Sequence, residues 1–311
     1  SGKIGATRAV GNTSINASDG AGTIDLFDIG DGTPAAGIDG TLTVGNTSTA
    51  QVELDGVNYD IFGNVLIKSK SGNHIDFSDT SGTTLDFRTT GAGSTIEFNT
   101  GTIEIADRTA ALEITSNNGN ITIGAIEGTH DEDITISAGT GTLQVGAIGQ
   151  TNAEGINTIA MTSTGAGTSK ITLTGSISTS DEAGNNVSFT GPVVIDGTVD
   201  IDTDTGTDGT IGFSSTIVGA ATGSNNLTLD SGGSAITLSG TIGVAAPLTS
   251  LNINQDGGAV ALTIPQIGTA GGSAGVTGAT NIGTTSTATV DMSAASYKFG
   301  GTTAIKAGTG S

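Results

Sequence analysis

The sequence contains no cysteine and no tryptophan, only four prolines, and nine basic residues against 30 acidic ones. Without cysteine, the chain has no disulfide bridges and no thiol chemistry. The basic residues are scattered singly, whereas phosphate backbones are held by clustered Lys and Arg, so the net charge of −21 argues against nucleic acid as a partner. No apolar run approaches the roughly 20 residues of a membrane-spanning helix, so we expect no membrane insertion.

Helical periodicity is also lacking, because no stretch combines good helix formers with apolar residues at i, i+3, i+4 and i+7. Thr, Ile and Val are abundant instead, and these residue types favour strands. The 52 glycines, together with Asn, Asp and Ser, fill the intervals between the apolar positions, as turns require. The composition therefore predicts an all-β chain.

One phrase of three residues, apolar, acidic and apolar, recurs four times between residues 74 and 106. Its copies are Ile75-Asp76-Phe77, Leu85-Asp86-Phe87, Ile96-Glu97-Phe98 and Ile103-Glu104-Ile105. Because side chains on a strand alternate between two faces, each phrase predicts a short strand with one dry face and one wet face. We expect the apolar members of the first three phrases to be buried and Asp76, Asp86 and Glu97 to be exposed.

These phrases belong to a ladder of strand centres that begins at Val65 and ends at Ile123, with short and similar intervals between them. Three consecutive intervals together have roughly the length of one coil of a three-sided β-solenoid. Antiparallel hairpins have similar spacing, but they favour Asn-Gly or Asp-Gly turns, whereas the connectors "SDTSG", "RTTGAG" and "NTG" are looser. We therefore predict a parallel β-solenoid (β-helix). The alternative is a set of tandem antiparallel β-sandwich domains with strand exchange between subunits.

A longer repeat lies in the C-terminal half, where the segment that begins at Ile134 matches the segment that begins at Leu227. We expect one elongated all-β domain over residues 1–311, with sub-units at 1–60 (N-terminal strands), 61–133 (short-period ladder) and 134–311 (duplicated longer repeat). The stretch "VSFTGPVVIDGTV…GTIGFSSTIVGA…NNLTLDSGGSAITLSGTIG…PLTSLNIN" carries the clearest pattern.

That stretch resembles the repeats of giant bacterial surface proteins of the filamentous-haemagglutinin and autotransporter-adhesin kind, over about residues 134–290. The resemblance implies a right-handed parallel β-helix that acts as a stalk or an adhesin, and it identifies no ligand. Members of those families are usually far longer, and this sequence shows neither their secretion domain nor an outer-membrane barrel pattern.

Residues suited to catalysis are sparse, and we predict that the chain is not an enzyme. The two histidines, His74 and His130, stand apart from any nucleophile or phosphate-loop motif. An alternative is a carbohydrate-active β-helix enzyme, which would need a groove holding three or more carboxylates with a basic residue such as Arg88, beside Asp86, or Arg108, beside Asp107. A carbohydrate-binding adhesin module is a further alternative, although Tyr59 and Tyr297 are the only tyrosines.

The densest acidic motif, "VDIDTDTGTDGT", predicts a metal site. Asp200, Asp202 and Asp204 alternate along a strand and Asp208 follows in a turn, and carboxylates packed in this way suit Ca²⁺, which takes six to eight oxygen ligands. The opposing interpretation is an acidic, solvated edge. Weaker versions of the motif are Asp25, Asp28 and Asp31 in "LFDIGDG", and Asp131, Glu132 and Asp133 in "HDED".

Both ends of the sequence are rich in small and alternating apolar residues, without a helical or charged cap. We expect a terminal strand around Tyr297, Phe299 and Ile305 to pair with the first strands of another copy, around Ile4 and Val10. Such head-to-tail contacts build an open filament, and donor-strand insertion is the alternative. The sequence thus predicts an extracellular structural protein on a prokaryotic cell surface. Its expected partner is itself, with other cells or surface polysaccharide as adhesion targets.

Overall fold

The computed structural model describes residues 3–16, 22–31, 37–47, 49–78, 82–105, 111–149, 155–167, 170–256 and 261–308. In these residues it has 28 short strands and no α-helix. A membrane-crossing helix is accordingly not found in this part of the chain. The chain divides into two compact units, the first made of residues 1–146 and 154–156 and the second of residues 147–153 and 157–311.

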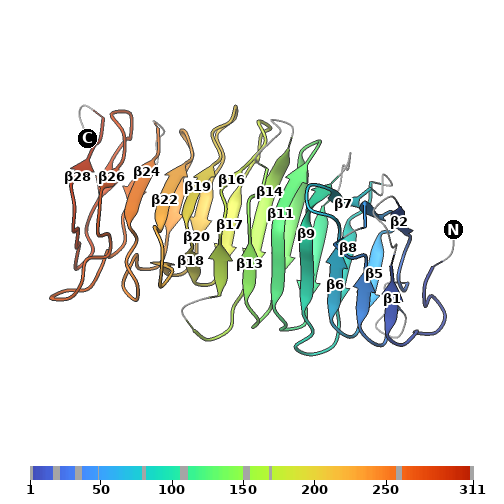
Figure 1. Ribbon diagram of the computed structural model, residues 1–311. Helices are drawn as coiled ribbons and strands as arrows, with labels where there is room; N and C mark the ends of the chain where they lie inside the picture. Colours follow the sequence, from blue (N-terminus) through green and yellow to red (C-terminus); the bar gives the residue numbers. More distant parts are fainter. Residues whose placement is uncertain are drawn as a thin grey trace. The chain divides into compact units, whose positions relative to one another are not determined.

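The first unit contains the strands that Figure 1 draws from blue to green. They are β1 (Thr13–Ile15), β2 (Thr23–Leu26), β3 (Leu42–Val44), β4 (Gln51–Leu54), β5 (Asn58–Ile61), β6 (Val65–Lys68), β7 (His74–Phe77), β8 (Leu85–Thr89), β9 (Ile96–Ile105), β10 (Leu112–Ser116), β11 (Ile121–Gly128), β12 (Glu132–Ser137) and β13 (Leu143–Val145). The predicted sub-unit boundary at residue 134 falls inside β12, and the single-domain organisation stays a prediction.

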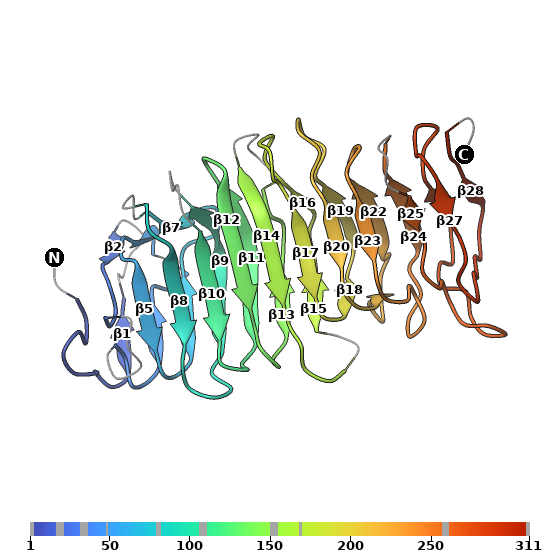
Figure 2. The same cartoon turned by 180° about the vertical axis from the view of Figure 1, so that it is seen from behind.

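The second unit contains the remaining strands, except that Ile156, the first residue of β14, belongs to the first unit; Figure 2 shows these strands from the opposite side. They are β14 (Ile156–Thr162), β15 (Ile171–Leu173), β16 (Ile177–Ser178), β17 (Val187–Thr190), β18 (Val193–Ile195), β19 (Thr198–Asp202), β20 (Ile211–Phe213), β21 (Ile217–Gly219), β22 (Asn226–Asp230), β23 (Ile236–Leu238), β24 (Ser250–Asn254), β25 (Leu262–Thr263), β26 (Thr280–Ile282), β27 (Val290–Asp291) and β28 (Thr303–Ile305).

Strands in both units pair in parallel with the equivalent strand of the next coil. In the first unit Val65 aligns with Ile96, so one coil begins at each of these residues. In the second unit Ile171 aligns with Val193, which makes the coil between them shorter than its counterpart in the first unit. The predicted parallel β-solenoid is confirmed. The antiparallel sandwich alternative is wrong, because the described strands pair in parallel and none of them pairs with the next strand along the chain as a hairpin.

Each unit has several strand stacks around one core. In the first, β1, β3, β6, β9, β11 and β13 are neighbours in that order, β2, β4, β7 and β9 form a second run, and β5, β8, β10 and β12 form a separate sheet. In the second, the stacks are β15–β18–β21, β14–β17–β20–β23, β16–β19–β22–β24–β26–β28 and β25–β27. Strand β9 therefore contributes to two runs of the first unit, since it continues around a corner.

The corner in β9 corrects one expectation from the sequence. The phrases Ile96-Glu97-Phe98 and Ile103-Glu104-Ile105 predict two strands, but both lie in β9, which spans Ile96–Ile105. Thr100, between them, has a φ of 71°. The left-handed backbone conformation of Thr100 turns the strand without ending it. The two halves of β9 therefore pair within different runs of strands.

The alternating faces are confirmed for the apolar residues, since Ile75, Phe77, Leu85, Phe87, Ile96 and Phe98 are all buried. The acidic residues between them differ from the prediction. Asp86 and Glu97 are half-buried, and the expected exposure of Asp76 is wrong, because Asp76 is 9% exposed. Outer-face side chains cover it: Gln51 of the adjacent coil donates a hydrogen bond to Asp76, and His74 of the same strand lies beside it.

Candidate functional site

The four predicted calcium ligands lie at the end of β19 and in the turn that follows. Asp200 and Asp202 occupy the outer face of β19, where they alternate with the buried Val199 and Ile201. Asp204 and Asp208 lie beyond the strand, and Asp204 is exposed. A strand therefore presents only the first two carboxylates on one face, and the turn decides where the other two point.

The turn brings Asp204 and Asp208 together. A methyl group placed on Gly232 of the next coil would lie 2.4 Å from Asp208 Oδ1 and 2.7 Å from Asp204 Oδ1, so both carboxylates face this glycine. The backbone N–H of Gly233 also donates to Asp208 Oδ2 at 2.7 Å. Asp202 instead stacks on Asp230 in β22. The structure thus gathers two of the four predicted ligands, and calcium at this position stays a prediction.

The pKa of Asp204 is raised to about 6. Partial desolvation of the carboxyl is the largest cause, followed by the hydrogen bond with Asp208 and by the negative charges of Asp208, Asp230 and Asp202. In an unfolded chain an Asp carboxyl has a pKa of about 3.9. Folding therefore favours the protonated form of Asp204.

This raised pKa makes the stability of the second unit depend on pH. The stabilisation from the held proton is fully present below about pH 4 and is lost as the pH rises through about 6. We expect Asp204→Asn to raise the melting temperature at pH 7, because it removes the repulsion, and to give little gain at pH 4. Calcium bound by the pair would raise the wild-type melting temperature at pH 7 by mass action.

Thermal unfolding across this pH range checks the prediction, with Asp196→Asn, an exposed aspartate of the same unit, as the control. An equal gain from Asp204→Asn at every pH would contradict the proposed coupling with Asp208. Wild-type melting that calcium and chelator leave unchanged would mean that the pair is simply solvated.

One carboxylate in each of the two weaker acidic motifs is bonded to neighbouring groups of the protein. Asp28 forms an ion pair with Lys3, with 2.8 Å between Lys3 Nζ and Asp28 Oδ2. It also accepts hydrogen bonds from the backbone N–H groups of Val57 and Asn58. Burial alone would raise the pKa of Asp28, but these hydrogen bonds together lower it. Glu132, which is 1% exposed, accepts the backbone N–H groups of Thr129 and His130 at 3.1 Å. Asp28 and Glu132 therefore stabilise turns.

Arg88 joins carboxylates on the outer face of the sheet β5–β8–β10. Its Nε lies 2.5 Å from Asp60 Oδ1 and its Nη1 lies 2.6 Å from Asp86 Oδ2. Glu113 of β10 aligns with Asp86 of β8. Arg88 and Asp86 thus share a face, as the sequence allows, whereas Arg108 and Asp107 lie outside the described residues. An open depression begins at Arg88 and is lined by threonine, serine and asparagine side chains.

A column of five carboxylates runs across the first unit, with one acidic residue in each successive coil. The strand registers align Asp25 with Glu53, Glu53 with Asp76, Asp76 with Glu104, and Glu104 with Glu127. Neighbouring strands lie about 4.7–4.9 Å apart, so the carboxylates repel one another. We call these five residues the acidic column.

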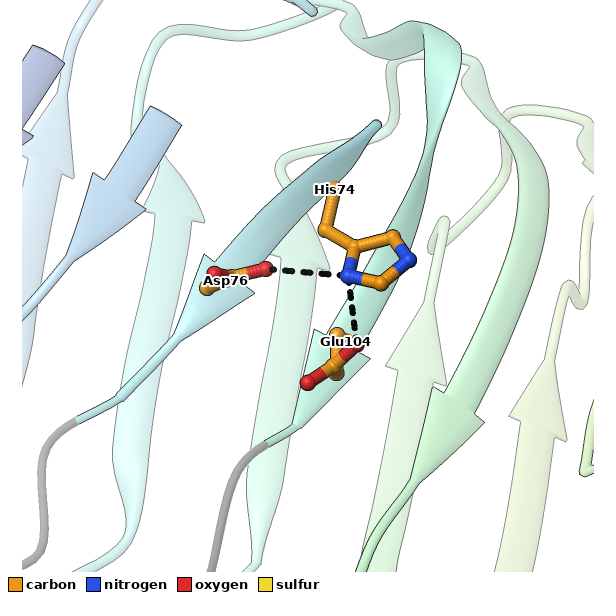
Figure 3. A group of neighbouring side chains, drawn as sticks. All are labelled: His74, Asp76 and Glu104. Atoms are coloured by element: carbon orange, nitrogen blue, oxygen red, sulfur yellow. Dashed lines mark ion pairs between the residues drawn. The ribbon is translucent and has the colours of Figure 1, made fainter. Parts of the chain in front are cut away.

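His74 lies at the centre of the acidic column and faces two of its members (Figure 3). Its Nδ1 is 2.5 Å from Glu104 Oε2 and 3.9 Å from Asp76 Oδ1. Asp76 and His74 project from the same face of β7, and Glu104 lies opposite Asp76 on β9. A second group, Asp25, Glu53 and Asp55, brings three carboxylates within 4.8 Å of one another.

The pKa of Asp76 is raised, mainly by burial and also by the negative charge of Glu104. The hydrogen bond from Gln51 and the nearby His74 act in the opposite direction without cancelling the rise. A buried, electron-rich oxygen thus lies beside an imidazole nitrogen. Such an arrangement can hold either a shared proton or a cation.

The repeated acidic positions of this cluster are visible in the sequence, but their spacing alone does not show which acidic residues stack on one another. Asp76 and Glu104 occupy equivalent places in two of the repeated phrases, one coil apart, and the structure stacks them. Asp86 and Glu97, in the two intervening phrases, lie on β8 and on the first half of β9. His74, which the sequence shows apart from any nucleophile motif, is the first residue of β7.

Comparisons with known proteins add no relative, since no family model, curated protein or solved structure matches the chain.

Proposed function

We propose that this chain is a structural protein of a prokaryotic cell surface, extracellular and non-enzymatic, whose coils extend into a filament by head-to-tail strand pairing with further copies. Adhesion to other cells or to surface polysaccharide is the function of the assembled filament. The observation that carries the proposal is the exposure of inward-facing apolar residues on the first and last described coils.

The last described coil of the second unit is incompletely covered. Ile282 and Val276 are fully buried, whereas their in-register neighbours Ile305 and Phe299 are 47% exposed and half-buried. Tyr297, stacked on the buried Ile267, is also half-buried. Covering these side chains with another coil would contribute about 25 cal/mol per Å² of apolar area.

The first described coil of the first unit has the same character. Val10 is 38% exposed, whereas Ile38, which it pairs with, is 1% exposed. Ile4 and Ile15 are half-exposed as well. Since a parallel ladder can be extended at either edge, a coil with open strand edges and uncovered apolar residues is suited to pair with a similar coil.

The backbone of β28 supports pairing at its outer edge. Thr302 C=O accepts from Thr280 N–H and Lys306 N–H donates to Ile282 C=O, so these groups face β26. Because backbone groups alternate along a strand, those of Thr303 and Ile305 face the other edge. Among the described strands, β26 is the one that pairs with β28.

We expect Ile305→Lys to prevent elongation, because a charged side chain would have to be buried at the junction between copies. Val244→Lys is the matched control, since Val244 is also an exposed apolar residue of the second unit (37% exposed) but lies outside the last coil. Sedimentation velocity over a concentration series, together with electron microscopy, measures filament length.

Two outcomes would contradict the proposal. One is an intact chain that remains monomeric at high concentration. The other is an Ile305→Lys variant whose filaments are as long as those of Val244→Lys.

A second candidate function is binding or cleavage of a carbohydrate. The observation that favours it is a group of three carboxylates and one basic residue on one outer face. The group consists of Asp60, Asp86, Glu113 and Arg88. Its weakness is that Arg88 already forms ion pairs with Asp60 and Asp86, and that no aromatic side chain is among the described residues that line the adjacent depression. Release of reducing ends from polysaccharides by the intact chain would favour this function over the structural one.

A further inference from the structure

The centre of the acidic column has the composition of a transition-metal site. We propose that His74, Asp76 and Glu104 bind one divalent transition-metal ion, such as zinc, through one imidazole nitrogen and two carboxylate oxygens. The proposal stands independently of filament assembly, because all three residues lie on the outer face of the first unit and none belongs to its first coil.

The three donor groups already converge. One ligand atom from each residue lies within 4.8 Å of the other two, and Figure 3 shows the imidazole turned toward both carboxylates. Zinc binds histidine nitrogen and carboxylate oxygen at about 2.0–2.2 Å. An ion between the three groups therefore requires small side-chain rotations and no movement of the strands.

Asp76 provides an independent observation that points to a ligand. The residue is 9% exposed, and its Oδ1 atom is buried without a hydrogen-bond partner. This oxygen is the one directed toward His74. An unsatisfied buried carboxylate oxygen is costly, and a metal ion at this point would satisfy it.

Gln51 holds the Asp76 carboxylate in its orientation by a hydrogen bond. Its Nε2 donates to the other oxygen of Asp76, Oδ2, so the carboxylate is fixed with Oδ1 facing the imidazole. Partners that hold a ligand's second oxygen in this way are typical of metal sites, and their loss usually costs about 10–100-fold in metal affinity. The cluster thus has ligands and a group that orients one of them.

A protonated histidine alone does not account for the arrangement. The imidazole at 2.5 Å satisfies Glu104, but Asp76 Oδ1, at 3.9 Å, receives no hydrogen bond. The flanking Glu53 and Glu127 add further negative charge in register. A doubly charged ion offsets more of this repulsion than a single proton does.

The ligand set distinguishes between metals. Calcium and magnesium prefer oxygen ligands, whereas an imidazole nitrogen favours zinc, copper or nickel. Three protein ligands would leave the fourth tetrahedral position of zinc to water. The neighbouring group of Asp25, Glu53 and Asp55 offers oxygens alone, so it suits calcium better than zinc.

The test is titration of the intact chain with zinc chloride by calorimetry, in the presence of excess calcium to occupy sites made of carboxylates alone. We expect one zinc ion per chain, and a loss of affinity of at least about tenfold in His74→Gln, in Glu104→Gln and in Gln51→Ala. His130→Gln is the matched control, since His130 is the chain's other histidine and lies in an exposed turn. Glu127→Gln controls for loss of charge in the acidic column.

Circular dichroism of each variant verifies that it is folded before the titration. Zinc binding of wild-type affinity in folded His74→Gln would overturn the proposal. So would an equal loss in His130→Gln or Glu127→Gln, because zinc would then be collected by the general negative charge of the chain.

Discussion

Replacing Phe87 with alanine is expected to lower the free energy of unfolding of the first unit by about 3–5 kcal/mol. Phe87 is fully buried and lies among three other rings, with centroid distances of 5.4 Å to Tyr59, 6.2 Å to Phe77 and 5.3 Å to Phe98. Tyr59 stacks on Phe87 within one sheet, whereas Phe77 and Phe98 come from β7 and β9. Removing the central ring therefore leaves a cavity that the rigid sheets cannot close.

Phe62→Ala is the control for this experiment, because Phe62 is 54% exposed and it joins the neighbouring coils through hydrogen bonds of its backbone, which alanine keeps. Its loss should remain within about 0.5 kcal/mol. Denaturant titration of both variants gives the comparison. Removal of a buried ring leaves a cavity and should cost much more than about 1 kcal/mol. A loss of unfolding free energy below that value for Phe87→Ala would mean that the ring cluster does not form the core of the first unit.

Gly191→Ala is expected to produce the second large loss, in the second unit. Gly191 has a φ of 125°, and an added methyl group would lie 1.9 Å from the carbonyl oxygen of Ser163 in the adjacent coil. The backbone conformation contributes about 1–3 kcal/mol of strain for a residue with a Cβ. The contact between coils adds overpacking of about 1–3 kcal/mol.

Gly197→Ala separates these two causes. Gly197 has a similar φ of 119°, but an added methyl group would meet no atom within 4 Å. Gly197→Ala should therefore show the conformational strain alone, and Gly191→Ala should cost more by the contact with Ser163. Equal losses in thermal or denaturant unfolding would show that the coils do not approach as closely here as the structure has them.

Much of the fold follows from short-range sequence pattern. In Ile75-Asp76-Phe77 the apolar residues are buried because strand side chains alternate, and no knowledge of neighbouring coils is needed to predict this. Coil length was also predictable, since Val65 and Ile96 are three phrases apart and are in register. The looser connectors correctly favoured parallel coils over hairpins.

What the sequence could not supply is the path of the chain at corners. The positive φ of Thr100 joins two predicted strands into β9, and threonine does not favour that conformation. The turn after β19 likewise brings Asp204 to Asp208 and leaves Asp200 on the strand. Alternation along a strand predicts faces, but it does not predict where a turn carries the next carboxylate.

The stacking of Asp76 on Glu104 and the contact of His74 with Glu104 depend on register between coils. Whether Asp76 stacks on Glu104 or on a residue one position away is decided by the lengths of the intervening turns, and a shift of one residue would place Glu104 on the opposite face. The sequence shows each acidic residue of the column, but their alignment is a property of the stacked coils.

Diffraction from oriented filaments of the intact chain tests the central claim most directly. Head-to-tail pairing predicts strands perpendicular to the filament axis, and hence a reflection at about 4.7–4.9 Å along that axis. The same specimen of Ile305→Lys should contain no filaments to orient. Filaments whose strand spacing of about 4.7–4.9 Å runs across the axis would mean that copies associate side by side, and that result would contradict assembly by strand pairing between end coils.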